Sequence, residues 1–264
     1  MRKLFNLLCG MLVASSLATV SAETPIMKIW KNGQVVAWHD NESLDSITFD
    51  LNKKESLGDY EYMINGYKFI DLGLPSGLLW AEKNVGAEKS TDSGNYYAWD
   101  ETAVKTEYSW ANYTYCYTHY DADPIKYNTD DEKTVLENVD DAAYANCGPY
   151  CSTPSPTNFE ELFNSEYCTV TSTTKDNVDG YEIVSKTNGK SIFLPKAGYW
   201  YGDRRYSNAG MYYWTNTRDS STDDSGNVKV KYAICFNPTA DLTDLTYSEL
   251  RDYGMLIRPV ATKE

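Results

Sequence analysis

Cysteine and histidine are the residues in this chain whose chemistry would be easiest to recognise from their spacing. Cys147 and Cys151 form a CxxxC pair, but no second pair of cysteines or histidines follows at the spacing of a zinc site. A nucleophilic cysteine needs a histidine partner, and the two histidines are His39, near the amino terminus, and His119, in a tyrosine-rich stretch beside Cys116. We therefore expect neither a zinc centre nor a catalytic cysteine.

The sequence does not determine which cysteines, if any, form disulfides. Five cysteines follow the first 22 residues: Cys116, Cys147, Cys151, Cys168 and Cys235. An oxidising compartment would allow disulfides, although an odd number leaves at least one thiol unpaired. For Cys147 and Cys151, a local disulfide and simple burial are both compatible with the sequence.

Carboxylates are the other groups that could do chemistry. Asp121, Asp123, Asp130 and Asp131 lie close together, and Ca²⁺ prefers such oxygen ligands, but Pro124 interrupts the cluster and no glycine stands at the turn of an EF-hand loop. Carboxylate pairs also serve glycosidases, but a chain with 38 acidic residues offers many pairs and nothing marks one of them. We expect no metal, no cofactor and no catalytic residue, and therefore not an enzyme.

The overall charge excludes one class of partner. The chain carries 38 acidic and 24 basic residues, for a formal net charge of −14 at pH 7. Such a chain repels phosphate backbones and anionic lipid headgroups. We expect no nucleic-acid partner.

Residues 1–22 have the features of a signal peptide. Arg2 and Lys3 precede an apolar stretch over residues 4–20, and small residues lead up to Ala22, after which we expect cleavage. The alternative is a membrane anchor, but the apolar stretch is short and is interrupted by serines. We expect export to the cell surface, the extracellular space or the periplasm, with no membrane insertion after cleavage.

A small β unit is predicted over residues 23–50. Strand-like residues 26–30 and 34–38 flank Asn32-Gly33, the dipeptide typical of a two-residue hairpin turn, and an apolar run at residues 44–49 closes the unit. The polar residues 51–59 are predicted to form a linker.

The main domain is predicted over residues 60–264, with few helices and many loops. A helix is expected at residues 133–145, capped by Asp130 or Asp131, and a second at residues 157–163, with Thr157 as N-cap and Glu160 completing a capping box. Strands are expected at residues 67–72, 78–81, 182–184, 191–194, 212–215, 228–236 and 255–260, and Asn188-Gly189 predicts a hairpin between residues 182–184 and 191–194. The predicted class is α+β.

Tyrosine is the most overrepresented residue, with 23 copies. Eight lie between residues 199 and 253 among Asn, Asp, Ser and Arg, a mixture typical of a contact surface because tyrosine offers a large area with a polar tip. The alternative is that these residues pack a β-rich fold or are ordinary loop residues. The predicted ligand contacts are Tyr201, Arg204, Arg205, Tyr206, Asn208, Tyr212, Asn216, Arg218, Asp244, Tyr247 and Arg251. We assign Trp214 to the core and Arg258 to a hydrogen bond or ion pair near the domain terminus.

Several ordered motifs resemble a known family of exported bacterial proteins, the FISUMP paralogous domains. The matching segments are DLGLPSGLLWA at residues 71–81, NVGA at 84–87, GNYYAW at 94–99, DDAA at 140–143, PTNFEEL at 156–162, SIFLP at 191–195, GY at 198–199, YWT at 213–215 and GMLIRPV at 254–260. The resemblance covers about residues 60–260.

The resemblance implies a C-type-lectin-like fold with few helices, short antiparallel strands and long loops. It is similar to the formylglycine-generating enzymes and to the variable proteins of diversity-generating retroelements, in which the region matching residues 198–260 presents ligand-contacting residues. The chain departs from the FISUMP pattern where Ser155-Pro156-Thr157 replaces the usual Met-Pro-Thr. It also lacks the Glu-Pro-Asn or Gln-Pro-Asp triplet of the calcium-dependent C-type lectins, and the active-site cysteine pair of the formylglycine-generating enzymes is not recognisable.

Three functions follow as hypotheses. The first is a binding protein for a glycan or a surface protein. The second is a structural component of a surface appendage, held by the amino-terminal β unit through strand addition. The third is an enzyme related to the formylglycine-generating oxidases, which rests on fold analogy alone.

Overall fold

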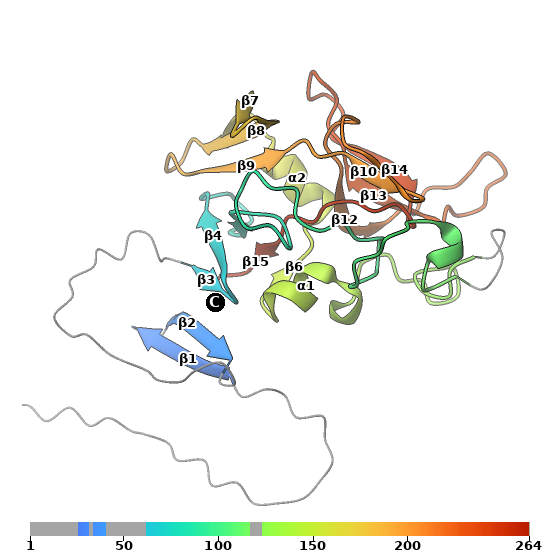
Figure 1. The fold of residues 1–264 in the computed structure, drawn as a ribbon, viewed down its shortest axis with the longest axis horizontal. Helices are drawn as coiled ribbons and strands as arrows, with labels where there is room; N and C mark the ends of the chain where they lie inside the picture. The colour runs from blue at the N-terminus through green and yellow to red at the C-terminus, as the bar shows by residue number, and fades with distance from the viewer. Residues whose placement is uncertain (1–25, 32–33, 41–61, 117–122, 264) are drawn as a thin grey trace, which may run out of the picture.

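The structure is a computed structural model that describes residues 26–31, 34–40, 62–116 and 123–263 (Figure 1). Within these ranges the fold is a β-rich α+β arrangement of antiparallel sheets with few, short helices, as the sequence predicts. No helix in the described ranges is long and apolar enough to cross a membrane. The predictions for residues 1–22, 44–49 and 51–59 lie outside the described residues.

The amino-terminal hairpin is confirmed. Strands β1 (Ile26–Lys31) and β2 (Gln34–Asp40) pair antiparallel, with Ile26 opposite Asp40 and Lys31 opposite Gln34. The connection is two residues long, as a turn containing Asn-Gly requires.

A five-stranded sheet joins the two ends of the main domain. Its order is β3 (Met63–Ile64), β4 (Tyr67–Asp71), β5 (Leu79–Ala81), β15 (Val260–Ala261) and β6 (Cys151–Ser152). The carboxy-terminal strand lies between β5 and β6, with Val260 opposite both Trp80 and Ser152. The strands expected at residues 67–72 and 78–81 are confirmed. Of the strand expected at residues 255–260, Met255 and Leu256 form single bridges, residues 257–259 form neither a strand nor a bridge, and only Val260 belongs to a strand.

The hairpin expected around Asn188-Gly189 is confirmed and has a third strand. Strands β7 (Cys168–Lys175), β8 (Val178–Ser185) and β9 (Ser191–Pro195) form an antiparallel meander. The sequence pattern of β7 is almost entirely polar, because much of this strand is exposed to solvent.

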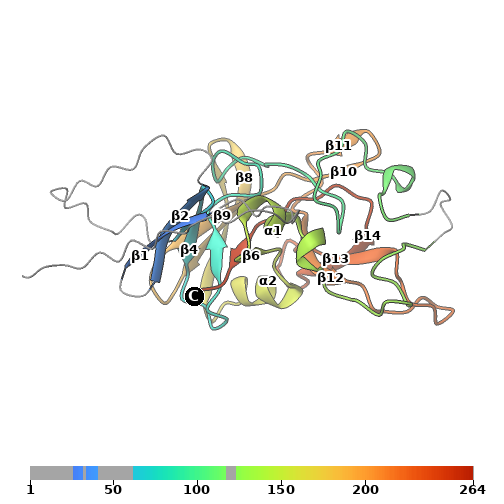
Figure 2. The ribbon, with the colours of Figure 1, turned by 90° about the horizontal axis from the view of Figure 1, so that it is seen from below.

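A second sheet and a short hairpin carry the tyrosine-rich region. The sheet has the order β12 (Tyr213–Arg218), β13 (Tyr232–Phe236), β14 (Thr246–Leu250), and the hairpin pairs β10 (Tyr199–Tyr201) with β11 (Arg204–Tyr206). Both lie on the same side of the molecule, away from β7 to β9 (Figure 1, Figure 2).

The helix expected over residues 133–145 is wrong for most of its length. Only the 3-10 turn η4 (Asn138–Asp140) and α1 (Ala142–Cys147) are helical, and Asp141 caps α1 by accepting hydrogen bonds from the amides of residues 143 and 144. Residues 134–136 instead form backbone hydrogen bonds with β12, in which Leu136 N donates to Asn216 O at 2.9 Å. Pairing with a distant strand therefore overrides the helical spacing.

The second expected helix is confirmed with a different cap. Helix α2 (Pro156–Leu162) begins after Ser155, whose hydroxyl accepts from the Asn158 amide, while the Asn158 side chain accepts from the Ser155 amide. Proline at the first helical position suits this start, since the missing amide would have had no partner. The capping box is thus Ser155 and Asn158 rather than Thr157 and Glu160.

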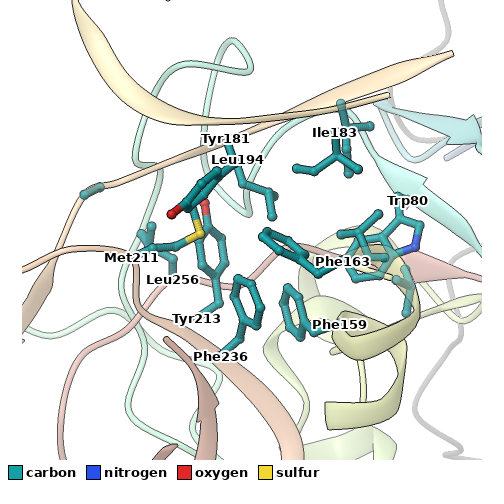
Figure 3. Close-up of a cluster of buried hydrophobic side chains, with 14 of the residues drawn as sticks. Trp80, Phe159, Phe163, Tyr181, Ile183, Leu194, Met211, Tyr213, Phe236 and Leu256 are labelled. Carbon is teal, nitrogen blue, oxygen red and sulfur yellow. The ribbon is translucent and has the colours of Figure 1, made fainter. Parts of the chain in front are cut away.

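Aromatic side chains form the core between these elements (Figure 3). Phe159 of α2 stacks on Phe236 with ring centroids 4.3 Å apart and meets Trp80 edge-on at 5.3 Å. Trp214 is buried as expected, and Arg258 donates to Asn84 Oδ1 at 2.8 Å and to the carbonyl oxygen of Phe193 at 2.8 Å. This core joins the five-stranded sheet to the tyrosine-rich side.

Candidate functional site

Four tyrosine rings form a continuous row, here named the tyrosine ladder. Tyr206, Tyr199, Tyr253 and Tyr201 follow one another with ring centroids 5.1, 5.4 and 4.7 Å apart. Tyr201, at one end, is 45% exposed, and Tyr206, at the other end, is partly exposed. The ladder presents aromatic surface that the fold has already ordered.

Local backbone pairing explains how the ladder forms. The hairpin places Tyr199 opposite Tyr206, and reciprocal bonds between Trp200 and Gly254, at 2.8 and 3.0 Å, bring Tyr253 beside the hairpin. Gly198 is required before the hairpin, since its φ is +66° and a Cβ there would lie 1.8 Å from the Tyr206 carbonyl oxygen.

Further side chains support the ladder. Tyr212 meets the Tyr199 ring edge-on at 4.8 Å, and the Arg204 guanidinium lies 5.5 Å from the centroid of the Tyr206 ring. Burial raises the pKa of Tyr199, Tyr212 and Tyr253, so their hydroxyls stay protonated at neutral pH. The surface therefore offers aromatic faces and hydroxyl donors without negative charge on the rings.

A pocket of about 540 Å³ adjoins the exposed end of the ladder, and we name it the aromatic pocket. Its lining comes from η3 (Trp110–Asn112), from the turn after β10, and from residues of β13 and β14 and their flanks. The side chains that shape it are Trp110, Tyr201, Lys231, Tyr232, Leu250 and Asp252.

Asp252 gives the aromatic pocket a buried carboxylate. The residue is 3% exposed, and its Oδ1 has no hydrogen-bond partner among the described residues. Burial raises its pKa to about 6, with smaller contributions in the same direction from Glu101 and Glu249, while a hydrogen bond from its own backbone amide and the charge of Lys105 act in the opposite direction. A buried acceptor without a donor is rare in folded proteins and costs stability.

Arg251, predicted as a ligand contact, is a core residue. It is fully buried, and its Nη2 donates to Asp100 Oδ2 at 2.5 Å while its Nη1 donates to the carbonyl oxygens of Lys126 and Val230 at 3.1 and 3.0 Å. Burial raises the pKa of Asp100 to about 7, while Arg251 and the Tyr113 hydroxyl act in the opposite direction. The prediction for Arg251 is corrected, because its side chain is fully buried and its Nη atoms already donate to Asp100 and to backbone carbonyl oxygens.

Arg218 requires the same correction. It is 5% exposed, and it donates to the carbonyl oxygens of Asp219 at 2.7 Å and Lys133 at 3.2 Å. Its guanidinium therefore ties β12 to the segment that runs beside it. Asn216, on the same strand, is partly buried and accepts a hydrogen bond from the Thr217 hydroxyl.

The remaining predicted contacts are on the surface but do not form one site. Arg205 and Asn208 line a separate hollow of about 570 Å³. Tyr247, 59% exposed, lines another of about 700 Å³ that shares Lys231 and Tyr232 with the aromatic pocket. Asp244 is exposed in the turn before β14. The structure brings together Tyr201, Arg204, Tyr206 and Tyr212 at the ladder.

Sequence reasoning missed most of the aromatic pocket. Trp110 and Asp252 are 142 positions apart, and no local pattern connects them. The only available signal was their setting, because Trp110 lies in a tyrosine- and tryptophan-rich stretch and Asp252 follows Arg251 in the region predicted to bind.

The CxxxC cysteines are two buried thiols. Cys151 Sγ lies 3.4 Å from the Cys147 carbonyl oxygen, and hydrogen bonding with Cys151 together with burial raises the pKa of Cys147 well above its usual range. A thiol held protonated is a poor nucleophile. His119 lies outside the described residues.

The described residues also contain no group of three or more His, Cys, Asp or Glu side chains that could hold a metal ion. Asp131, one of the four acidic residues weighed as a calcium site, accepts hydrogen bonds from the amides of Tyr127, Asn128 and Lys133. Asp121 lies outside the described residues.

This chain matches no protein-family model, no curated protein and no solved structure. The family resemblance stays a prediction, and the site rests on its own geometry.

Proposed function

We propose that this chain is an exported, non-catalytic binding protein that presents the tyrosine ladder to a glycan or surface-protein ligand. The observation that carries the proposal is a row of four ordered tyrosine rings, exposed at Tyr201, beside a pocket that contains an unpartnered carboxylate oxygen. Aromatic and arginine side chains are favoured anchors at interfaces.

Preorganisation supports this role. Tyr199 and Tyr253 are held by backbone bonds and by their neighbours' rings, so a ligand that lies on the ladder orders few additional side chains. The entropy that binding usually costs is therefore reduced. Arg204 and Tyr206 extend the same surface with a cation and a hydroxyl.

The proposal includes the compartment and the finer fold. The leader-like residues 1–22 support export, and the few helices, short antiparallel strands and long loops support a C-type-lectin-like domain of the FISUMP type. The acidic charge is compatible with a glycan or a protein and disfavours nucleic acid.

The experiment is a binding screen of the protein on intact cells and on a glycan array. Tyr206→Ala combined with Tyr201→Ala should weaken binding at least about tenfold, since it removes both ends of the ladder. Tyr144→Ala, at a partly exposed tyrosine of α1, is the matched control and should bind like the unmodified protein. Equal binding by the ladder variant and the control would reject the ladder as the contact surface.

Assembly into a surface structure is a second candidate, favoured by one observation. Within the described residues β1 and β2 form a sheet of their own, so each strand has an edge that could pair with another chain. Oligomers that depend on concentration and disappear when residues 23–57 are deleted would support assembly. A monomer at all concentrations would count against it.

A further inference from the structure

The aromatic pocket combines an apolar wall with an unused acceptor. Tyr201 presents an exposed ring that is backed by Tyr253, with the ring centroids 4.7 Å apart, and Leu250 continues this wall. Asp252, which also lines the pocket, has an oxygen with no donor among the described residues. Because that oxygen reduces the stability of the folded chain, a ligand that donates a hydrogen bond to it gains an interaction that the protein alone lacks.

The charges around the pocket select against charged ligands. Lys231 lines the pocket, with Nζ 5.8 Å from the centroid of the Trp110 ring, so a cation meets positive charge there, whereas Lys105 is paired with Glu101 at 2.5 Å. An anion meets Asp252 and the nearby Glu249. A wholly apolar ligand would leave the buried oxygen of Asp252 unpaired. The ligand class that remains is uncharged, with an apolar face and hydroxyl groups.

A sugar ring has these properties. Its C–H face stacks on an aromatic ring, and its hydroxyls both donate and accept hydrogen bonds. The pocket volume of about 540 Å³ lies within the usual range of small-ligand sites.

We propose that the aromatic pocket binds one ring of an uncharged glycan, with the ring stacked on Tyr201 and a sugar hydroxyl donating to Asp252 Oδ1. This inference rests on the proposed binding function and deepens it by naming the ligand class. Lys231, on the wall, supplies a positive charge that suits a sugar oxygen.

The test uses the full-length protein on a printed array of neutral, sialylated and sulfated glycans, followed by titration calorimetry with the neutral glycan that gives the strongest signal. Asp252→Asn should weaken binding about 10- to 100-fold, the range for loss of a charge-assisted hydrogen bond. Tyr201→Ala should weaken it about tenfold or more through loss of stacking. Asp203→Asn, at an exposed carboxylate between β10 and β11, is the matched control and should leave the affinity within about twofold.

Measuring the melting temperature of each variant separates an effect on binding from an effect on folding. Asp252→Asn removes a buried charge, so its melting temperature should equal or exceed that of the unmodified protein while its affinity falls. Weaker binding accompanied by a lower melting temperature would overturn the role of Asp252 as a ligand contact.

The outcomes also separate this inference from the proposed function. Binding of sialylated or sulfated glycans alone, or neutral-glycan binding unaffected by Asp252→Asn, would overturn the inference and leave the binding function intact. Binding to a cell-surface protein with no glycan signal would do the same. No binding to arrays or cells would reject both.

Discussion

Replacing Arg251 with Met tests whether this arginine is a structural residue of the core. The substitution keeps most of the side-chain length but removes the charge, which leaves Asp100 and the carbonyl oxygens of Lys126 and Val230 buried without their donor. Removing one partner of a buried ion pair costs about 3–5 kcal/mol. In a domain of this size, each kcal/mol lowers the melting temperature by about 2–4 °C, so we expect a decrease of about 6–20 °C.

The assay is urea and thermal unfolding of the full-length protein, followed by tryptophan fluorescence. Arg204→Met, at an exposed arginine of β11, is the matched control and should change the free energy of unfolding by less than about 0.5 kcal/mol. The double variant Asp100→Asn, Arg251→Met should be more stable than Arg251→Met alone, because the unpaired carboxylate is removed. If Arg251→Met has the same free energy of unfolding as the control, the buried ion pair does not stabilise this domain.

Three further predictions concern pH, thiol reactivity and the hairpin. Burial raises the pKa of Asp252 to about 6, whereas the unfolded chain releases this proton above about pH 4. The folded state therefore binds this proton more tightly, and the stability gained from it is lost as the pH rises from 4 to 6. In Asp252→Asn, the decrease in the free energy of unfolding across that interval, measured by urea titration, should be smaller by up to about 3 kcal/mol. Because the pKa of Cys147 is raised, iodoacetamide at pH 8 should modify Cys147 and Cys151 only after unfolding, as read by peptide mass spectrometry. Gly198→Ala should lose about 1–3 kcal/mol from backbone strain, and more from the contact with Tyr206 O, measured by thermal unfolding.

Each of these predictions has its own control. Asp203→Asn, at an exposed carboxylate, should leave the pH profile unchanged, and a profile for Asp252→Asn that matches it would contradict the reasoning. Alkylation of Cys147 in the folded protein at the rate of the unfolded chain would show that the thiol is not shielded. Gly226→Ala separates strain from collision, because Gly226 also has a positive φ but nothing within 4 Å of its added Cβ. Gly198→Ala should be the less stable of the two.

Local sequence features determined several parts of this protein. The Asn-Gly signals predicted the hairpins of β1 with β2 and of β8 with β9, because turn geometry and strand alternation are decided within about ten residues. Trp214 was correctly assigned to the core, and α2 was placed within two residues of its start. The tyrosine-rich composition drew attention to the region of β10 and β11, where the tyrosine ladder lies.

Long-range contacts decided the rest. Residues 134–136 pair with β12 and are not helical, because a distant strand supplies their hydrogen-bond partners. Arg251 and Asp252 are adjacent in the sequence, yet only the position of Asp100, about 150 residues away, shows that the arginine is the paired core residue and the aspartate the one that lines the pocket. Burial of a charged group is favourable only where a partner is already in place, and that partner is supplied by tertiary structure.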